Sequence, residues 1–306
     1  WKHHTKVAGL EWKNPVGTAS GTFQYAAVRW FYDVSQLGAV CTKGASPVPW
    51  EGNPSPRTAE SPAANINAVG LQNPGIDHYL AEDLPKLKAA GAFVISNVAG
   101  HCDDDYAAVV EKLADSDADM LEINVSCPNV ANLTSLQDKN NLNLILRGLI
   151  DFRRGQNQYR PILLKISPDL TDAQIDDMID VLVETGLDGI VATNTTTRRD
   201  GLETDPATVA AIGNGGLSGG PLTRRSLEVV RYIHEKTEGR FPIIGVGGIM
   251  TEDDAVAMLN AGASLIQIYT GFIYNGPQFV KRICKRLKQE AESKTKTETR
   301  SESGQR

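Results

Sequence analysis

The sequence predicts an α/β protein with the architecture of a single (β/α)8 (TIM) barrel. Short apolar runs recur along the chain, and most of them precede an amphipathic helical pattern. Eight such units fit into about 280 residues, which is a usual size for this fold. Several of the runs are almost continuously apolar, as expected for parallel strands that are covered on both faces.

Eight runs are expected to form the strands of the barrel. They are Asn14–Ser20, Ala39–Lys43, Phe93–Val98, Met120–Val125, Ile162–Ile166, Gly189–Thr193, Pro242–Val246 and Leu265–Tyr269.

The segments between these runs have helical spacing. Apolar residues recur at i, i+3, i+4 and i+7 over Tyr106–Leu113, and a similar pattern over Ile175–Val183 follows a cap at Thr171 or Asp172. A doubly wound open sheet is the alternative architecture. That fold would normally place a glycine-rich phosphate loop after the first strand, and the sequence has none there.

Two segments fall outside the repeating pattern. Ala45–Tyr79 is long, rich in Pro, Asn and Gly, and follows a predicted strand, so we expect a loop that covers the active site. Residues 288–306 carry almost no apolar side chains, which predicts a disordered polar tail. The barrel is therefore expected to span residues 1–287.

Composition excludes several classes of function. The 306-residue chain has a net charge of -6, which argues against a general nucleic-acid binder. No run approaches the roughly 18 apolar residues of a membrane helix, and the polar start does not resemble a signal peptide. The four cysteines lack metal-site spacing, which predicts free thiols in a reducing cytoplasm and no metal.

The predicted strand ends carry an unusual set of side chains. Two lysines, Lys43 and Lys165, several asparagines and the thiol of Cys127 would meet at one mouth, whereas acids and histidines are nearly absent. This set suits a neutral or anionic planar ligand with many hydrogen-bonding edges, such as a flavin. It does not suit a carboxylate-pair hydrolase or a divalent metal.

The glycines after the last two predicted strands indicate phosphate binding. Gly247-Gly248 and Thr270-Gly271 occupy the positions where barrels commonly hold phosphate through backbone N–H groups. Simpler interpretations remain open for the other residues. Lys165 could be a surface charge, each asparagine a turn residue, and Cys127 a buried structural thiol that Pro128 holds in an extended loop.

Taken together, the strand ends resemble the dihydroorotate dehydrogenase family over about residues 7–287. The matching stretches are Asn14-Pro15, Thr18–Phe23, Lys43-Gly44, Asn65–Gly75, Asn124–Asn129, Lys165–Pro168, Thr193–Thr195, Gly215–Gly219 and Gly245–Ile249.

The two halves of the chain resemble different classes of that family. Residues 7 to about 130 are similar to the soluble class that uses a cysteine base. From about Asn132 onward, the chain is more similar to the membrane-associated class that uses a quinone. A natural mosaic or an engineered chimera, with a junction near residues 128–135, is the interpretation that this difference favours.

The resemblance implies FMN-dependent oxidation of (S)-dihydroorotate to orotate in de novo pyrimidine biosynthesis. Cys127 would remove the C5 proton, and hydride from C6 would pass to FMN N5; Lys43 would also belong to the catalytic set. The implied substrate-binding residues are Lys43, Asn67, Gly70, Leu71, Asn124, Asn129, Asn194 and Thr195. The implied FMN-binding residues are Ala19, Ser20, Gly21, Lys43, Asn97, Asn124, Lys165, Thr193, Gly219, Gly247, Gly248, Thr270 and Gly271.

Other functions stay open at this point. The principal alternative is an FMN-binding barrel with impaired or no turnover, because the loop after Cys127 departs from the pattern of the first half. A tRNA-reducing flavin barrel and a flavin-free phosphate-sugar barrel are weaker alternatives. The electron acceptor could be fumarate, a quinone or a partner iron–sulfur flavoprotein subunit. The resemblance also implies a homodimer without a stable membrane anchor.

Overall fold

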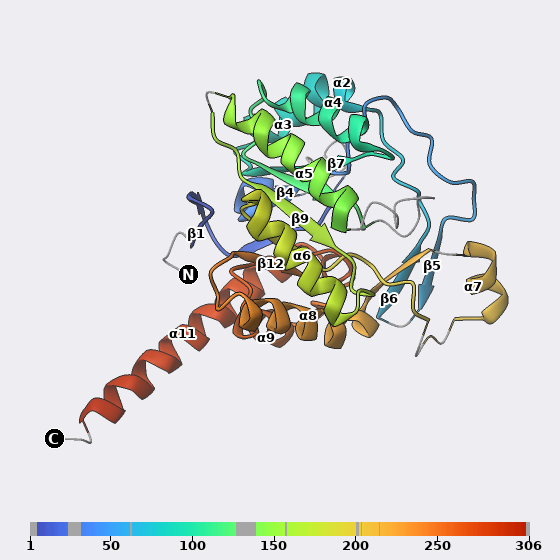
Figure 1. Cartoon of the computed structure of the whole chain (residues 1–306). Coiled ribbons are helices and arrows are strands. Elements are labelled where there is room, and N and C mark those ends of the chain that lie inside the picture. Colours follow the sequence, from blue (N-terminus) through green and yellow to red (C-terminus); the bar gives the residue numbers. More distant parts are fainter. Residues whose placement is uncertain are drawn as a thin grey trace.

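The computed structural model describes residues 5–23, 32–61, 63–126, 139–156, 158–199, 202, 204–213 and 215–303. Within these residues, eight parallel strands close into a barrel in the order β10-β12-β13-β3-β4-β7-β8-β9 (Figure 1). The barrel strands are β3 (Val16–Thr18), β4 (Ala39–Cys41), β7 (Val94–Ala99), β8 (Met120–Asn124), β9 (Ile162–Ile166), β10 (Gly189–Ala192), β12 (Ile243–Val246) and β13 (Leu265–Ile268). Each strand lies at a predicted run, and the TIM-barrel prediction is confirmed.

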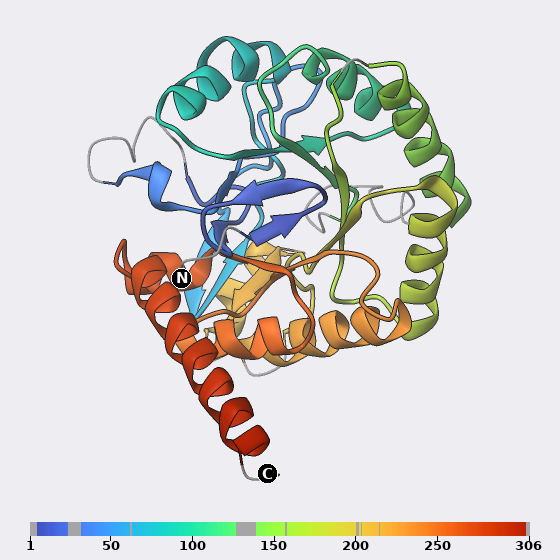
Figure 2. The ribbon, with the colours of Figure 1, turned by 90° about the vertical axis from the view of Figure 1, so that its left-hand side faces the viewer.

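Helices form a ring around these strands (Figure 2). The longer ones are α4 (Asp103–Leu113), α5 (Lys139–Arg154), α6 (Asp172–Thr185), α8 (Thr223–Lys236), α9 (Glu252–Asn260) and α11 (Phe279–Ser303). The shorter ones are η1 (Val34–Gln36), α2 (Ile76–His78), η2 (Tyr79–Asp83), α3 (Leu84–Ala89), α7 (Pro206–Ile212), η4 (Gly220–Leu222) and α10 (Thr270–Asn275). The predicted apolar stripe of α4 is buried, whereas in α6 Val181 is buried and Val183 is exposed.

A hairpin closes the amino-terminal end of the barrel. Strands β1 (Thr5–Val7) and β2 (Leu10–Trp12) pair in antiparallel fashion and lie across the barrel opening (Figure 2). The Trp12 side chain is fully buried, with its ring centroid 5.0 Å from that of Phe93. Residues that face the barrel interior pack against this hairpin, so the end opposite the site is sealed by apolar side chains.

The predicted covering loop contains two strands of its own. Strands β5 (Thr58–Ser61) and β6 (Ala64–Asn67) join β11 (Gly216–Gly219) in an antiparallel sheet of order β11-β6-β5. This sheet lies beyond the carboxyl ends of the barrel strands (Figure 1). Because Asn67 is the register partner of Gly216, the sheet joins the loop after β4 to the segment after β10 at the barrel mouth.

The carboxyl-terminal residues differ from the prediction. Residues 288–303 continue helix α11 instead of forming a disordered tail, and the helix projects away from the barrel (Figure 2). Leu287 is buried, and the residues at 288–294, the last ones whose burial the structure describes, are partly or fully exposed. Lysine and glutamate favour helices, and ion pairs four residues apart, such as Lys288–Glu292, support these turns.

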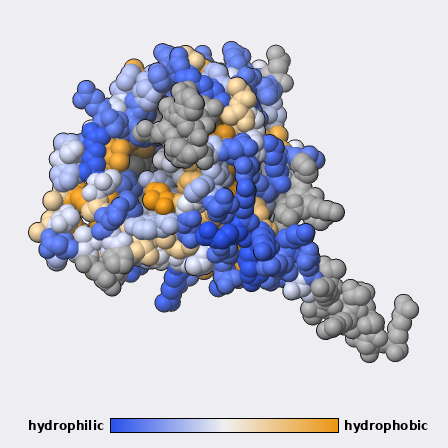
Figure 3. Space-filling model, turned by 180° about the vertical axis from the view of Figure 1, so that it is seen from behind, coloured by the Kyte–Doolittle hydropathy of each residue, from blue (hydrophilic) through white to orange (hydrophobic). Residues whose placement is uncertain are grey.

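The molecular surface carries its hydrophobic residues in separate places. Figure 3 shows small hydrophobic patches among mostly hydrophilic side chains on one face. The large apolar side chains with high exposure come from different elements, including Leu144 of α5, Val183 of α6 and Ile273 of α10. In the described part of the chain, these exposed side chains do not form a continuous apolar stripe along one helix.

Helix α9 begins with a capping box that follows the glycines after β12. The Thr251 hydroxyl accepts a hydrogen bond from the Asp254 N–H, and the Asp254 carboxylate accepts one from the Thr251 N–H. Replacing Thr251 with alanine is expected to lower the free energy of unfolding by about 1 kcal/mol, because one helix N–H loses its partner. Urea unfolding would measure the loss. Thr251→Ser keeps the acceptor, and an equal loss in that variant would contradict the explanation.

Candidate active site

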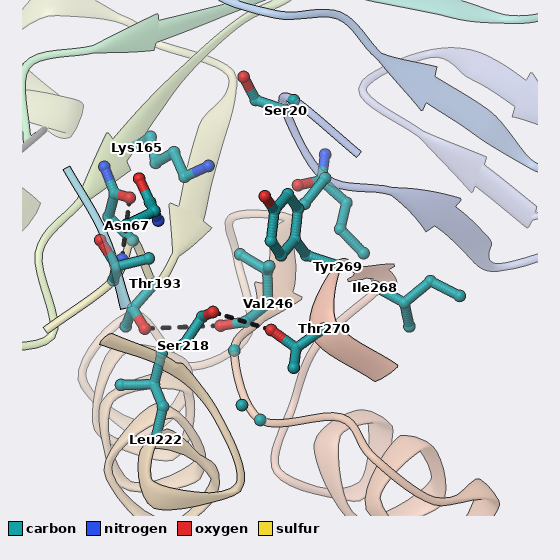
Figure 4. A pocket seen from close by; sticks show the side chains of 18 of the residues that line it. Ser20, Asn67, Lys165, Thr193, Ser218, Leu222, Val246, Ile268, Tyr269 and Thr270 are labelled. Carbon is teal, nitrogen blue, oxygen red and sulfur yellow. Dashed lines mark hydrogen bonds between the residues drawn. The ribbon is translucent and has the colours of Figure 1, made fainter. Parts of the chain in front are cut away.

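A cavity opens at the carboxyl ends of the barrel strands, beneath the β5–β6–β11 sheet. Figure 4 shows Lys165 and Asn67 on one side of it and Tyr269 on the opposite side. The predicted site residues that line it are Ala19, Ser20, Gly21, Lys43, Asn67, Gly70, Leu71, Asn124, Lys165, Thr193, Asn194, Thr195, Gly219, Gly247, Gly248, Thr270 and Gly271. Residues far apart in the sequence thus meet in one place, as the topology of parallel strands requires.

Three of the predicted site residues are not among those that line the cavity. Cys127 and Asn129 lie outside the described residues, as does the proposed junction at 128–135. Asn97 does not line the cavity. Its side chain is fully buried, and its Nδ2 donates to Glu122 Oε1 at 2.7 Å, so it lies beneath the cavity floor. The FMN contact implied for Asn97 stays a prediction.

Amide side chains form a connected group on one wall. Asn194 Nδ2 donates to Ser126 Oγ at 3.0 Å and lies 3.3 Å from Asn124 Oδ1, which also accepts from the Ser126 N–H. The Tyr106 hydroxyl donates to the Asn124 carbonyl oxygen at 2.8 Å. These contacts fix the orientation of two asparagines, so that the wall offers amide groups to a ligand.

The glycines after β12 pack against the start of helix α8. A Cβ atom on Gly248 would lie 2.3 Å from the Thr223 backbone nitrogen, and one on Gly247 would lie 2.4 Å from Ser226 Oγ. Both residues have positive φ angles, 70° at Gly248 and 114° at Gly247. Only glycine meets both requirements, and its bare backbone lets a ligand approach closely.

Hydroxyl groups border this glycine segment. Ser218 and Thr270 share a hydrogen bond of 2.8 Å between their hydroxyl oxygens (Figure 4). Thr193 and Ser226 share another of 3.0 Å. The combination of glycine backbone and hydroxyl groups is chemically suited to a phosphate group.

The sequence did not identify two polar residues at the floor of the cavity. Glu122 is fully buried in β8, and Gln267 of β13 lines the cavity. Glu122 stands inside an apolar run that is buried on both faces, which was an available signal because a charge there requires a partner. The structure supplies that partner, since Lys165 Nζ lies 3.4 Å from Glu122 Oε1.

Electrostatics at the cavity are dominated by lysines. Burial, with a smaller contribution from the positive charge of Arg57, lowers the pKa of Lys43. Burial raises the pKa of Tyr269, which therefore stays neutral at physiological pH.

In the described residues, no cluster of three His, Cys, Asp or Glu side chains could hold a metal ion. No helix of that same part is long and apolar enough to cross a membrane.

The residues present fit a flavin. Gln267 Oε1 and Asn97 Oδ1 are buried oxygen acceptors without a hydrogen-bond partner in the structure. Buried acceptors of this kind require a donor. Gln267 lines the cavity, so this unpaired oxygen belongs to a residue at the place where a heterocycle with N–H groups would bind. The glycine segment is chemically suited to a phosphate, so the two features together are compatible with FMN.

A second cavity lies beside the first, between β4 and helices α2 to α3. It is larger, about 540 Å³ against about 190 Å³, and the two cavities share Lys43 and Gly44. Asn73, which lines the second cavity, shapes the loop: its Oδ1 accepts from the N–H groups of Ser46 and Gly75. Apart from Lys43, none of the predicted site residues lines this second cavity, so the chemistry is assigned to the first.

The fold and the cavity define a (β/α)8-barrel protein with a cationic, amide-rich ligand site next to a glycine segment suited to phosphate. Comparison with known proteins narrows this class. The family model for dihydroorotate dehydrogenase matches residues 3–290. The chain therefore belongs to the dihydroorotate dehydrogenase family and is an oxidoreductase.

Individual relatives agree with this assignment. A protein of Christiangramia forsetii named dihydroorotate dehydrogenase (quinone) is 40% identical over 294 residues, covering 92% of this chain and 83% of the relative. The dihydroorotate dehydrogenase B (NAD(+)) catalytic subunit of Alkaliphilus metalliredigens is 38% identical, covering 88% and 87%. The crystal structure of the Eimeria tenella enzyme in complex with ferulenol superimposes with a TM-score of 0.77 at 29% identity, covering 93% and 83%. The relatives thus differ in the electron acceptor that their names give.

Proposed function

We propose that this chain catalyses the FMN-dependent oxidation of (S)-dihydroorotate to orotate in de novo pyrimidine biosynthesis. The observation that carries the proposal is the single cavity in which Lys43, Asn67, Asn124, Lys165 and Asn194 meet beside the glycine segment. A member of the dihydroorotate dehydrogenase family with this set of side chains has the groups needed to hold a flavin and a carboxylated pyrimidine.

The proposed cofactor site occupies the part of the cavity nearest β12 and β13. FMN, when bound there, supplies the acceptor for the hydride that leaves C6 of the substrate. Gly247, Gly248, Thr270 and Gly271 would hold its phosphate, and Lys165 would face the flavin with its ammonium group. The remaining FMN contacts are proposed for Ala19, Ser20, Gly21, Lys43, Asn124, Thr193 and Gly219.

The proposed substrate site uses the amide wall and the covering loop. Asn67, Asn124, Asn194 and Thr195 would donate to and accept from the edges of the pyrimidine ring, because these groups line one connected cavity. Lys43 would pair with the substrate carboxylate. Gly70, Leu71 and Asn129 complete the proposed set.

The proposed base is Cys127. A thiolate takes up a proton efficiently when its pKa lies near the working pH, and nearby cations lower the pKa of a thiol. In the sequence, Cys127 follows Asn124, the last residue of β8, by three positions. In this role it would remove the C5 proton of dihydroorotate.

Anaerobic titration with dihydroorotate tests the proposal. The full chain loaded with FMN should lose its flavin absorbance near 450 nm in proportion to added substrate, since two electrons pass to the cofactor. Flavin-loaded protein that does not bleach would favour the alternative of an FMN-binding barrel with impaired turnover. A chain that binds no flavin would overturn the cofactor assignment.

The same preparation distinguishes the electron acceptors. Fumarate, a water-soluble quinone, and NAD⁺ with an added iron–sulfur flavoprotein subunit would each be supplied to the reduced enzyme. The acceptor that restores the flavin absorbance fastest is identified as the electron acceptor of this enzyme.

Size-exclusion chromatography would test the proposed homodimer, and cell fractionation would test the proposed cytoplasmic location.

The lowered pKa of Lys43 predicts how orotate binding depends on pH. Orotate affinity should be constant while Lys43 is protonated and fall as the pH rises through its depressed pKa, because the carboxylate loses its cation. Isothermal titration between about pH 7 and 9.5, in a Cys127→Ser background, removes the contribution of the thiol. Lys43→Met should bind weakly at every pH. A pH-dependent fall that persists in Lys43→Met would contradict the assignment.

A further inference from the structure

A polar cluster is buried in the barrel interior beneath the cavity floor, and Glu122 of β8 is its centre. Glu122 Oε1 accepts from Asn97 Nδ2 at 2.7 Å and lies 3.4 Å from Lys165 Nζ. Glu122 Oε2 accepts from Gln267 Nε2 at 3.4 Å and from Cys41 Sγ at 3.5 Å. One carboxylate thus collects four donors from four other strands.

Barrel topology explains why these residues meet. Asn97 of β7 is the direct register partner of Glu122, whereas Lys165 pairs in register with Asn124, two residues further along β8. Gln267 reaches Glu122 from β13 on the opposite side of the barrel. Lys165 and Gln267 also line the cavity, so Glu122 contacts two residues of the cavity wall.

The burial of this pair makes the two charges dependent on each other. The Glu122 side chain is 0% exposed and that of Lys165 only 6%. Within the part of the chain that the structure describes, no other carboxylate lies within 4.0 Å of Lys165 Nζ. Burial and the negative charge of Glu122 raise the pKa of Cys41 well above its ordinary value, so Cys41 remains a thiol donor to the carboxylate. Removing either charge would leave the other one buried and unpaired.

We propose that Glu122 is the positioning residue for Lys165: it holds the ammonium at the cavity floor and sets the net charge that this floor presents to the flavin. Glu122 does not line the cavity itself. It acts through Lys165, whose positive charge it offsets. The expected effect on the flavin potential rests on the proposed function, because it requires FMN in the cavity. The expected effect on the stability of the chain does not require FMN.

A double-mutant cycle tests the pairing without any flavin. Lys165→Met should lower the Tm of the full chain strongly, because the Glu122 carboxylate loses its cation in a dry interior. Adding Glu122→Gln should restore much of that loss, since a neutral pair of similar volume is tolerated. A double variant that is no more stable than Lys165→Met would overturn the proposal.

The midpoint potential of bound FMN tests the effect on the flavin. Glu122→Gln preserves the side-chain volume, and its amide N–H can donate to the Gln267 oxygen, which has no partner in the structure. The variant makes the floor more positive. The equilibrium for two-electron reduction should then shift about tenfold towards the reduced flavin, which corresponds to a rise of about 30 mV.

Dye-coupled reduction under anaerobic conditions would measure this potential, so the readout does not require turnover of dihydroorotate. Glu184→Gln is the matched control, because Glu184 lies on the outer helix α6 with its side chain 44% exposed and should leave the potential unchanged. An unchanged or lowered potential in Glu122→Gln would overturn the proposal. A chain that binds FMN but does not oxidise dihydroorotate would instead count against the proposed function alone.

Discussion

A Cys127→Ala chain is expected to bind FMN as the unmodified protein does and to lose about 10²- to 10⁴-fold of its turnover near pH 7. The loss follows from the proposed role of the thiolate as the base for the C5 proton of dihydroorotate. Alanine has no group that can take up this proton. Stopped-flow bleaching of the flavin by dihydroorotate would measure the step directly.

Two other cysteine variants give this experiment its controls. Cys102→Ala removes an exposed thiol at the start of α4 and should leave the rate unchanged. Cys127→Ser should retain part of the activity at higher pH, because a hydroxyl gives up its proton less readily than a thiol. Undiminished bleaching in Cys127→Ala would remove Cys127 from the proposed mechanism, whereas loss of FMN binding in that variant would indicate a structural role.

The barrel could be predicted because its signal is repeated along the chain. Strands buried on both faces need apolar residues at nearly every position, as in Ile162–Ile166, so each strand appears as a short continuous run. Several structural strands begin or end within one or two residues of the prediction. Strand β3 covers only Val16–Thr18 of the predicted run, although the Ala19 N–H still donates to the Ile268 carbonyl oxygen beyond its end.

The mouth of the barrel was predictable for a related reason. Parallel strands bring their carboxyl ends to one side, so a list of strand ends is also a list of neighbours. Residues inside the strands are not grouped by this rule. The resemblance implied an FMN contact for Asn97, near the end of β7, and the sequence did not show that its register partner is Glu122, which accepts a hydrogen bond from Asn97 Nδ2 beneath the floor.

Helix α11 illustrates a different limit of sequence reasoning. Residues 288–303 lack the apolar side chains that pay for ordering a segment, and this property predicted disorder. Local helix propensity and ion pairs act independently of burial, however. Arg286–Glu290 and Lys294–Glu290 connect successive turns, so the helix that packs up to Leu287 continues outward.

A Gly248→Ala substitution is the second change for which we expect a large effect, and its target is the proposed phosphate segment. The added Cβ would lie 2.3 Å from the Thr223 backbone nitrogen and 2.4 Å from its Cα, distances that real Cβ atoms do not adopt. Because the obstacle is backbone, the glycine segment itself has to move. Overpacking of this kind costs about 1–3 kcal/mol.

When this cost opposes the binding of FMN, a loss of about 1–3 kcal/mol corresponds to an FMN affinity that is about 5- to 150-fold lower. The quenching of flavin fluorescence on binding would measure the affinity. Gly186→Ala separates steric collision from backbone strain. Gly186 has a similar φ of 77°, but no atom lies within 4 Å of the Cβ position, and it ends helix α6 away from the cavity. Equal FMN affinities for Gly248→Ala and Gly186→Ala would contradict the proposed phosphate site. Of these two glycines, only Gly248 lines the cavity, and only there would the added Cβ force the backbone to move.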